Sequence, residues 1–160
     1  MAMNDGLEIK INAEHRLVIC RRAGLLSSEH AGQLLNFLLA REDSYPILFN
    51  RLLDLSLVTE IRLSSAVIYA YATVRPAATA NPPTFRVAII ARDSPVEAAA
   101  LIYATLMEDS KIPISIFRDT RSAADWLGVP HKVLQPDPIQ TAHPPPPSTH
   151  PAASYSQSAD

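Results

Sequence analysis

Few residues of this chain have the types and spacing that catalysis requires. The 160-residue sequence has five histidines, and only His15 and His30 precede its proline-rich end. His15 falls in a predicted turn and His30 in the first turn of a predicted helix, which favours surface positions for both. The four glycines are not clustered as in a phosphate-binding loop, and no Gly-x-Ser-x-Gly or His-Glu-x-x-His motif occurs. The sequence therefore predicts no catalytic residues, although an enzyme whose site is assembled from distant positions stays open as an alternative.

Other reactive side chains have structural explanations, so no metal site and no cofactor is expected. Cys20 is the only cysteine, which excludes an internal disulfide and a cysteine-based zinc site. It lies in an apolar run, which favours a buried and inert thiol. Asp93 and Asp119 follow predicted strands, where α/β proteins often bind ligands, but carboxylates at such positions more often form turns and cap helices. The remaining histidines are spaced too widely to indicate metal binding: His131, His143 and His150.

The charge balance narrows the classes of partner. Fourteen basic and 16 acidic residues leave a net charge of −2, without the basic surface that nucleic acids or anionic membranes attract. No run approaches the roughly 20 apolar residues that span a bilayer. Residues 1–6 have neither the basic nor the apolar part of a secretory signal. We therefore expect a cytoplasmic protein that is not an integral membrane protein and does not bind nucleic acid.

Short apolar runs alternate with helical patterns between residues 7 and 128. Strands are predicted at residues 7–11, 16–21, 47–55, 85–91 and 112–117. Helices are predicted after Ser27 and at residues 66–74, 94–109 and 120–127. The order β-β-α-β-α-β-α-β-α indicates an α/β domain with a mostly parallel central sheet and helices packed on it. Helices on one face would leave the other face to the hairpin or to a partner chain.

Local signals mark the ends of several elements. Gly24 is expected to end the second strand. Ser94, Pro95 and Glu97 form a capping-box pattern with Ser94 as the N-cap. Gly128 is expected to end the last helix.

The composition changes after Gly128. Eight of the 14 prolines lie from Pro130 onward, and the segment has almost nothing to bury. Such a segment does not offset the entropy of ordering, although a docking motif in polyproline II form is an alternative. The expected organisation is an N-terminal extension at residues 1–6, one domain at 7–128, and a disordered proline-rich tail at 129–160.

Three segments, taken together and in order, resemble the STAS domain in its SpoIIAA-like branch of bacterial proteins. They are residues 53–66, which resemble the family's strand, loop and Ser-Ser helix start, residues 86–91, and residues 114–128. The resemblance covers about three quarters of the chain, from Leu7 to Gly128. It implies a STAS fold and a non-enzymatic binding or regulatory domain.

The resemblance also implies a regulatory site. In antagonist members of the family, a serine at this helix start is phosphorylated and controls docking to a partner kinase. Transferred to this sequence, the candidates are Ser64 and Ser65, with Asp54 as the acidic residue that ends the preceding strand. A phosphate there would meet free N–H groups and the positive end of the helix dipole. The chain has Leu63 and Ala66 where the family has an acidic residue and a glycine, and a plain N-cap role for Ser64 is the alternative.

The helix at residues 66–74 is apolar almost all round and must bury two faces. The second face would pack on a helix neighbour or a homodimer partner, or it would line a pocket. Some members of the branch resemble the SEC14-type lipid-binding fold, which implies a pocket for a small apolar, lipid-like ligand with a tyrosine as polar handle. The candidate residues are Val67, Ile68, Tyr69 and Tyr71. The leading hypothesis is docking of a protein partner at the Ser-Ser helix start, and the alternative is a carrier or sensor of an apolar ligand.

Overall fold

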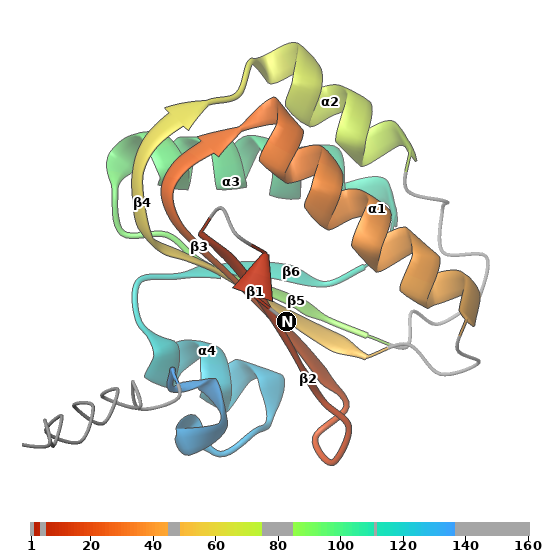
Figure 1. The fold of residues 1–160 in the computed structure, drawn as a ribbon, viewed down its shortest axis with the longest axis vertical. Coiled ribbons are helices and arrows are strands. Elements are labelled where there is room, and N and C mark those ends of the chain that lie inside the picture. Colours follow the sequence, from red (N-terminus) through yellow and green to blue (C-terminus); the bar gives the residue numbers. More distant parts are fainter. Residues whose placement is uncertain (1, 4–5, 45–48, 75–84, 111, 137–160) are drawn as a thin grey trace, which may run out of the picture.

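A computed structural model describes residues 2–3, 6–44, 49–74, 85–110 and 112–136. Its centre is a six-stranded sheet in the order β1-β2-β3-β4-β5-β6 (Figure 1). The strands are β1 (Ala2–Met3), β2 (Leu7–Asn12), β3 (Leu17–Ser27), β4 (Asn50–Arg62), β5 (Val87–Ile90) and β6 (Ile114–Phe117). The first three pair antiparallel, and β3 to β6 are parallel, which confirms the predicted α/β order apart from the short additional β1.

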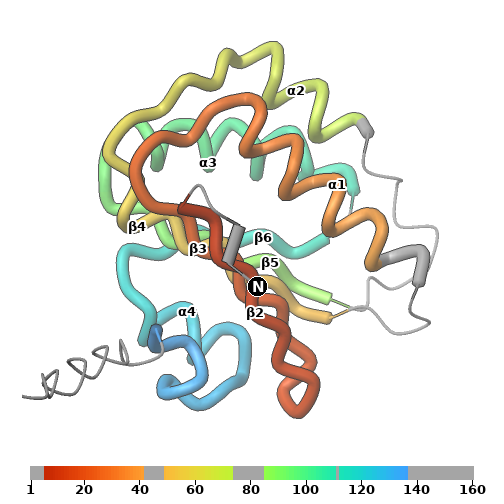
Figure 2. The backbone as a smooth tube through the Cα atoms, in the orientation of Figure 1, coloured from red at the N-terminus to blue at the C-terminus, as the bar shows by residue number. Residues whose placement is uncertain are grey.

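Helices cover both faces of the sheet. On one face lie α1 (Ser28–Ser44), α2 (Ser65–Val74) and α3 (Ser94–Leu106), which a 3-10 turn at Glu108–Ser110 follows. Parallel strands in sequential order with right-handed crossovers place their connecting helices on one side. The other face is covered by α4 (Thr120–Leu127) and the 3-10 helix η2 (His131–Leu134), as Figures 1 and 2 show. The expectation that the hairpin or a partner chain would cover this face is therefore wrong.

The second strand does not end at Gly24. Gly24 lies inside β3 at φ 74°, and the pairing of β3 with β4 shifts register between Arg21 and Ala23 and again between Gly24 and Leu25. A glycine in the left-handed region accommodates such an irregularity at low cost, so the strand bends instead of stopping. Beyond it, β3 and β4 curl together toward α1 and α2 (Figure 1). The predicted strand at residues 47–55 is likewise too short, because β4 continues to Arg62.

The start of α3 differs from the predicted capping box. Asp93 occupies the N-cap position and Ser94 is the first helical residue, with no side-chain hydrogen bond from the cap. The Glu97 carboxylate instead accepts a hydrogen bond from Arg118 at 2.6 Å. That ion pair draws the glutamate toward the loop after β6, away from the helix start.

The last helix agrees with its prediction. α4 runs from Thr120 to Leu127, and the Asp119 side chain caps it by accepting from the Ser122 backbone N–H at 2.8 Å. This hydrogen bond lowers the pKa of Asp119. Gly128 ends the helix in the left-handed conformation at φ 73°. Both ends of α4 therefore follow from local sequence signals.

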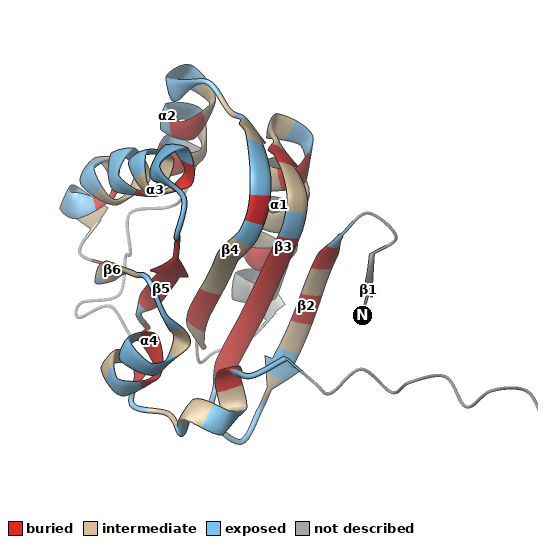
Figure 3. Cartoon of the chain, turned by 90° about the vertical axis from the view of Figure 1, so that its left-hand side faces the viewer, coloured by how far each residue is buried: buried red, intermediate tan, exposed pale blue. Residues whose placement is uncertain are grey.

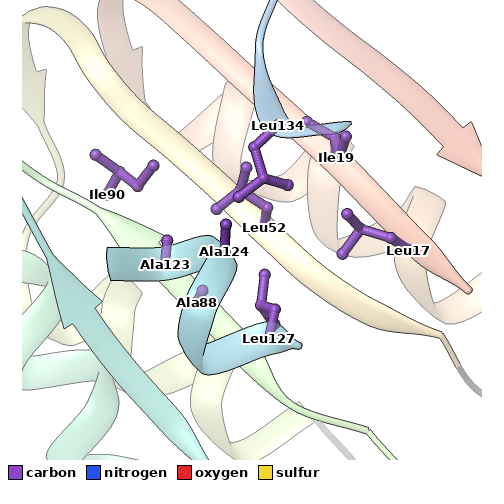
Figure 4. Close-up of a cluster of buried hydrophobic side chains, with 9 residues drawn as sticks. All are labelled: Leu17, Ile19, Leu52, Ala88, Ile90, Ala123, Ala124, Leu127 and Leu134. Atoms are coloured by element: carbon purple, nitrogen blue, oxygen red, sulfur yellow. The ribbon is translucent and has the colours of Figure 1, made fainter. Parts of the chain in front are cut away.

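The described structure continues past Gly128. The Leu134 side chain is fully buried, and its cluster contains side chains of α4 and of three strands (Figure 4). The cluster comprises Leu17, Ile19, Leu52, Ala88, Ile90, Ala123, Ala124, Leu127 and Leu134. Residues 131–134 are thus part of the domain, and the predicted boundary at residue 128 lies too early. Residues 137–160 of the expected tail lie outside the described residues.

The alternation of side chains along the strands produces two separate cores. Leu17 and Ile19 of β3 face α4, whereas Val18 and Cys20 pack with Leu38 of α1. Figure 3 shows the buried residues concentrated along the first half of β3 and along β5. Among the residues that the structure describes, no helix is long and apolar enough to cross a membrane.

Candidate functional site

An apolar cavity of about 140 Å³ lies between the three-helix layer and the sheet. Its sheet side is formed by residues of β4 and β5, and one end by the curled parts of β3 and β4. Its roof comes from α1, α2 and α3. The helix residues that line it are Ala31, Leu34, Leu35, Leu38, Ile68, Tyr71, Val96, Ala99, Ala100 and Tyr103.

The space follows from two features of the fold. Small side chains, Ala99 and Ala100 on α3 and Ala31 on α1, stand where larger ones would fill the layer. In addition, β4 extends from Asn50 to Arg62 while β5 ends at Ile90, so the helices cover an uneven floor. Protein interiors are normally close-packed, with few voids larger than a water molecule, so a cavity of this size is distinctive.

Tyr71 connects two of the helices that cover the cavity. Its hydroxyl donates a hydrogen bond to the Ser28 carbonyl oxygen at 2.5 Å, which joins α2 to the first residue of α1. A Cβ atom at Gly32 would lie 3.2 Å from the Tyr71 hydroxyl oxygen, so the glycine leaves room for this contact. Tyr71 therefore combines an apolar ring in the cavity wall with a hydroxyl that fixes the position of α2.

Arg51 places a buried charge in the cavity wall. The residue is 3% exposed, and its guanidinium carbon lies 4.4 Å from the centre of the Phe85 ring. This geometry is a cation–π contact. Burial raises the pKa of the Cys20 thiol to about 12, and the nearby Arg51 charge opposes this shift. In the sequence, Arg51 interrupts the apolar run at residues 47–55.

The structure separates the four predicted residues of the second helix. Ile68 is buried and, with Tyr71, lines the cavity. Val67 is half-buried and is not in the cavity wall, while Tyr69 is 58% exposed. The two cavity residues stand three positions apart, as expected for one face of a helix.

Sequence reasoning missed Arg51, Ala99 and Tyr103. The usable signal was the charge of Arg51 within an apolar run predicted to be a strand of the mostly parallel sheet, since such strands are buried on both faces. Burial of a charge is costly unless neighbouring groups pair with it or hydrogen-bond to it, whereas a charge on an exposed strand is stabilised by water.

Ser64 and Ser65 lie together at the start of α2, and both are exposed. The Ser64 hydroxyl oxygen accepts from the Val67 backbone N–H at 3.3 Å, which is the N-cap arrangement. Asp54 lies elsewhere, because β4 continues through residues 55–62 before the serines. Asp54 Oδ2 stands 3.7 Å from Arg21 Nε, and the structure does not bring it to the helix start.

The two histidines near the N-terminus differ from expectation. His15 is half-buried, and His30 is buried at 7% exposure, so the predicted surface position of His30 is wrong. His30 Nε2 lies 3.1 Å from Arg22 Nη2, and Nδ1 lies 3.0 Å from the Ser27 hydroxyl oxygen. Because arginine only donates, Nε2 is the acceptor of that pair. His30 thus supports the start of α1. In the described part of the chain, no three His, Cys, Asp or Glu side chains cluster as metal ligands would.

Comparisons with known proteins bear on the fold. No family model matches the chain, and no curated protein matches it. Among solved structures, an uncharacterized protein from the DUF3478 family with a SpoIIAA-like fold, from Shewanella loihica PV-4, is 21% identical with a TM-score of 0.52. The similarity covers 79% of this chain and 98% of that chain. The predicted STAS-type fold is confirmed: the chain has a SpoIIAA-like α/β fold.

Proposed function

We propose that this chain binds a small, mostly apolar molecule in the cavity beneath α1, α2 and α3, and acts as its carrier or sensor. The observation that carries the proposal is the cavity itself, which is lined mainly by leucine, isoleucine, valine and alanine side chains. An apolar cavity of roughly 150 Å³ in another protein stays dry and binds benzene. A cavity of about 140 Å³ offers comparable space.

The lining favours binding over chemistry. Among the described residues that form it, the polar side chains are Arg51, Tyr71 and Tyr103. These three do not make a nucleophile with its base, nor a pair of carboxylates. The site supports recognition of shape and apolar surface, with a few polar contacts to orient the ligand.

The dimensions limit the ligand. The lining residues on α1 run from Ala31 to Leu38, and those on α3 from Val96 to Tyr103. Seven residues of helix rise about 10 Å. By comparison with benzene in a similar cavity, the ligand has on the order of six to ten non-hydrogen atoms. A single ring or a short alkyl chain fits this limit, and a long-chain lipid exceeds it.

Hexanol is a suitable probe because it is small, flexible and mostly apolar. We expect saturable binding by isothermal titration calorimetry, with the negative heat-capacity change that apolar burial produces. Ala99→Leu fills the cavity and should weaken hexanol binding at least tenfold. Ala98→Leu is the matched control, because Ala98 is the exposed neighbour on the same helix. Equal effects of the two substitutions, or no saturable binding to the unmodified chain, would overturn the proposal.

A second candidate function is docking of a protein partner at the start of α2. It is supported by the exposure of Ser64, which caps α2, and of Ser65 and Tyr69 on α2. Phosphorylation of Ser65 would add negative charge at this helix N-terminus. The double substitution Ser65→Glu with Tyr69→Ala should abolish a partner contact and leave hexanol binding unchanged. Partner binding that survives this change would exclude the α2 start as the docking site.

A further inference from the structure

The outer sides of α2 and α3 carry two exposed stripes without charge. Each stripe repeats at the spacing i, i+3, i+4, i+7, which places its four members on one side of a helix. The members are Ala66, Tyr69, Ala70 and Thr73 on α2, and Ala98, Leu101, Ile102 and Thr105 on α3. The exposed side of a helix in a soluble domain is normally charged or polar, so these stripes mark a surface suited to contact with another protein.

The two stripes belong to one face of the domain. α2 and α3 pack against each other in the layer above the sheet (Figure 1). Their cavity residues, such as Ile68 and Ala100, lie on the inner sides, and Figure 3 shows exposed residues along the outer sides. We call the eight residues of the two stripes the α2–α3 face. This face points away from the cavity, so its role does not depend on the ligand.

The α2–α3 face offers no charge to a partner. α2 has no charged residue between Ser65 and Val74. The only charged residue of α3 is Glu97, whose carboxylate accepts a hydrogen bond from Arg118. A partner with a charged surface would bury its charges here without compensation, which is unfavourable. The occupant must therefore present a similarly uncharged helical surface, and a second copy of this chain presents one.

The shape of the α2–α3 face also fits a second copy, because large side chains alternate with small ones along it. The large side chains are Tyr69, Leu101 and Ile102, with exposed fractions of 58%, 54% and 39%, and the small ones are Ala66, Ala70 and Ala98. Packed helices interdigitate when large residues lie over small ones. In a two-fold dimer the same surface is used by both copies, so the protruding side chains of each copy occupy the spaces above the alanines of the other.

The area of the face sets the strength of the contact. α2 and α3 have 10 and 13 residues, which makes them about 15 and 20 Å long. Two neighbouring helices together are about 20 Å wide, so the face covers on the order of 400 Å² per copy and 800 Å² per dimer. Stable interfaces bury about 1,200–2,000 Å² in total, and transient ones bury less. The face therefore fits a dimer that forms reversibly.

We propose that two copies of this chain associate through the α2–α3 face as a reversible two-fold dimer. The four helices pack between the two sheets, and the α4 face of each copy stays outside. This inference goes beyond the proposed function, because the dimer forms with the cavity empty or filled.

Sedimentation velocity of the full chain tests the dimer. Between roughly 1 and 300 μM, the range expected for a small interface, the average mass should rise from that of one chain toward twice that value. High salt should not dissociate the dimer, because the face is uncharged. A chain that stays monomeric throughout, grows without limit, or dissociates in high salt would overturn the inference.

Ile102→Glu places a charge in the contact and should weaken dimerisation roughly tenfold or more. Ile11→Glu is the matched control, because Ile11 lies on β2 and is 38% exposed, against 39% for Ile102. Circular dichroism checks that both variants fold. Where Ile102→Glu does not fold, Leu101→Glu replaces it, since Leu101 is 54% exposed. A dimer that survives the glutamate on α3, or that Ile11→Glu weakens equally, would show that the copies associate through another surface.

Discussion

The Arg21 guanidinium donates a hydrogen bond to the Leu134 carbonyl oxygen at 2.6 Å, across 113 positions of the chain. Arg21 is 8% exposed and lies on β3, between Glu8 of β2 and Asp54 of β4 in register. This contact holds η2 on the face of the sheet opposite the cavity. The segment after α4 is therefore attached by a charged hydrogen bond and by the buried Leu134 side chain.

Leu134→Ala should destabilise the domain by about 2–5 kcal/mol, because it leaves a cavity in a fully packed cluster. Lys132→Ala is the matched control on the same 3-10 helix, where the side chain is exposed and the expected change is within about 0.5 kcal/mol. Urea unfolding followed by circular dichroism measures both. Equal unfolding midpoints for the two variants would show that η2 does not contribute to the core.

Asp54→Asn should lower stability by roughly 1–3 kcal/mol, because it removes one carboxylate from a nearly buried arginine. The side chains of Arg21 and Asp54 are 10% and 12% exposed, and Glu8 Oε2 remains 3.7 Å from Arg21 Nη1. Hexanol affinity should not change, since Asp54 is not among the residues that line the cavity.

Glu60→Gln provides the control for Asp54. Glu60 pairs with Arg62 at 2.6 Å, but both side chains are more than half exposed. Exposed pairs contribute about 0–1 kcal/mol. A loss of stability as large as that of Asp54→Asn would contradict a structural role that depends on burial.

Much of the fold was accessible from local sequence patterns. The alternating strand at Leu7–Asn12 and the helix at Thr120–Leu127, with its Asp119 and Gly128 ends, follow from periodicity and capping. Local patterns failed at Leu134, which lies between two prolines and looks like the beginning of a tail. Its side chain is buried against residues of distant strands and of α4, and its carbonyl oxygen accepts from Arg21, and none of these contacts can be inferred from the neighbouring sequence.

The candidate site was accessible only in part. Ile68 and Tyr71 could be predicted, because the apolar helix had to bury a second face. The cavity is an unfilled space between three helices and a sheet, and such a space depends on how distant elements pack. Arg51 was visible as an odd charge in an apolar run, but its contact with Phe85 depends on the pairing of β4 with β5.

Ser64→Ala should cost about 1 kcal/mol of stability, the usual effect of losing an N-cap side chain. Ser65→Ala is the control, because no hydrogen bond of its side chain supports the helix start in the described contacts. Thermal unfolding of both variants gives the comparison. Equal destabilisation would show that the Ser64 hydroxyl does not cap α2.

Tyr71→Phe should lower stability by about 1 kcal/mol, because it removes the hydrogen bond to Ser28 and keeps the ring. Tyr69→Phe removes the same hydroxyl from an exposed residue and should have no measurable effect. Hydrogen exchange in α2 should increase in the first variant only. Unchanged exchange would show that the Tyr71–Ser28 contact does not hold the roof of the cavity.

Cys20 should resist alkylation in the folded protein. Its thiol is 2% exposed, and burial raises the pKa from 9.0 to about 12, so the reactive thiolate is scarce at pH 8. In the unfolded chain the thiol ionises near its ordinary pKa, so the unfolded state loses its proton first as the pH rises. Stability should therefore be at its full value below pH 9 and decline between pH 9 and 12. Iodoacetamide labelling with and without urea tests the first expectation. Cys20→Ala, which lacks the titrating group, should show a smaller alkaline loss of stability than the unmodified chain, and identical pH profiles would contradict a buried neutral thiol.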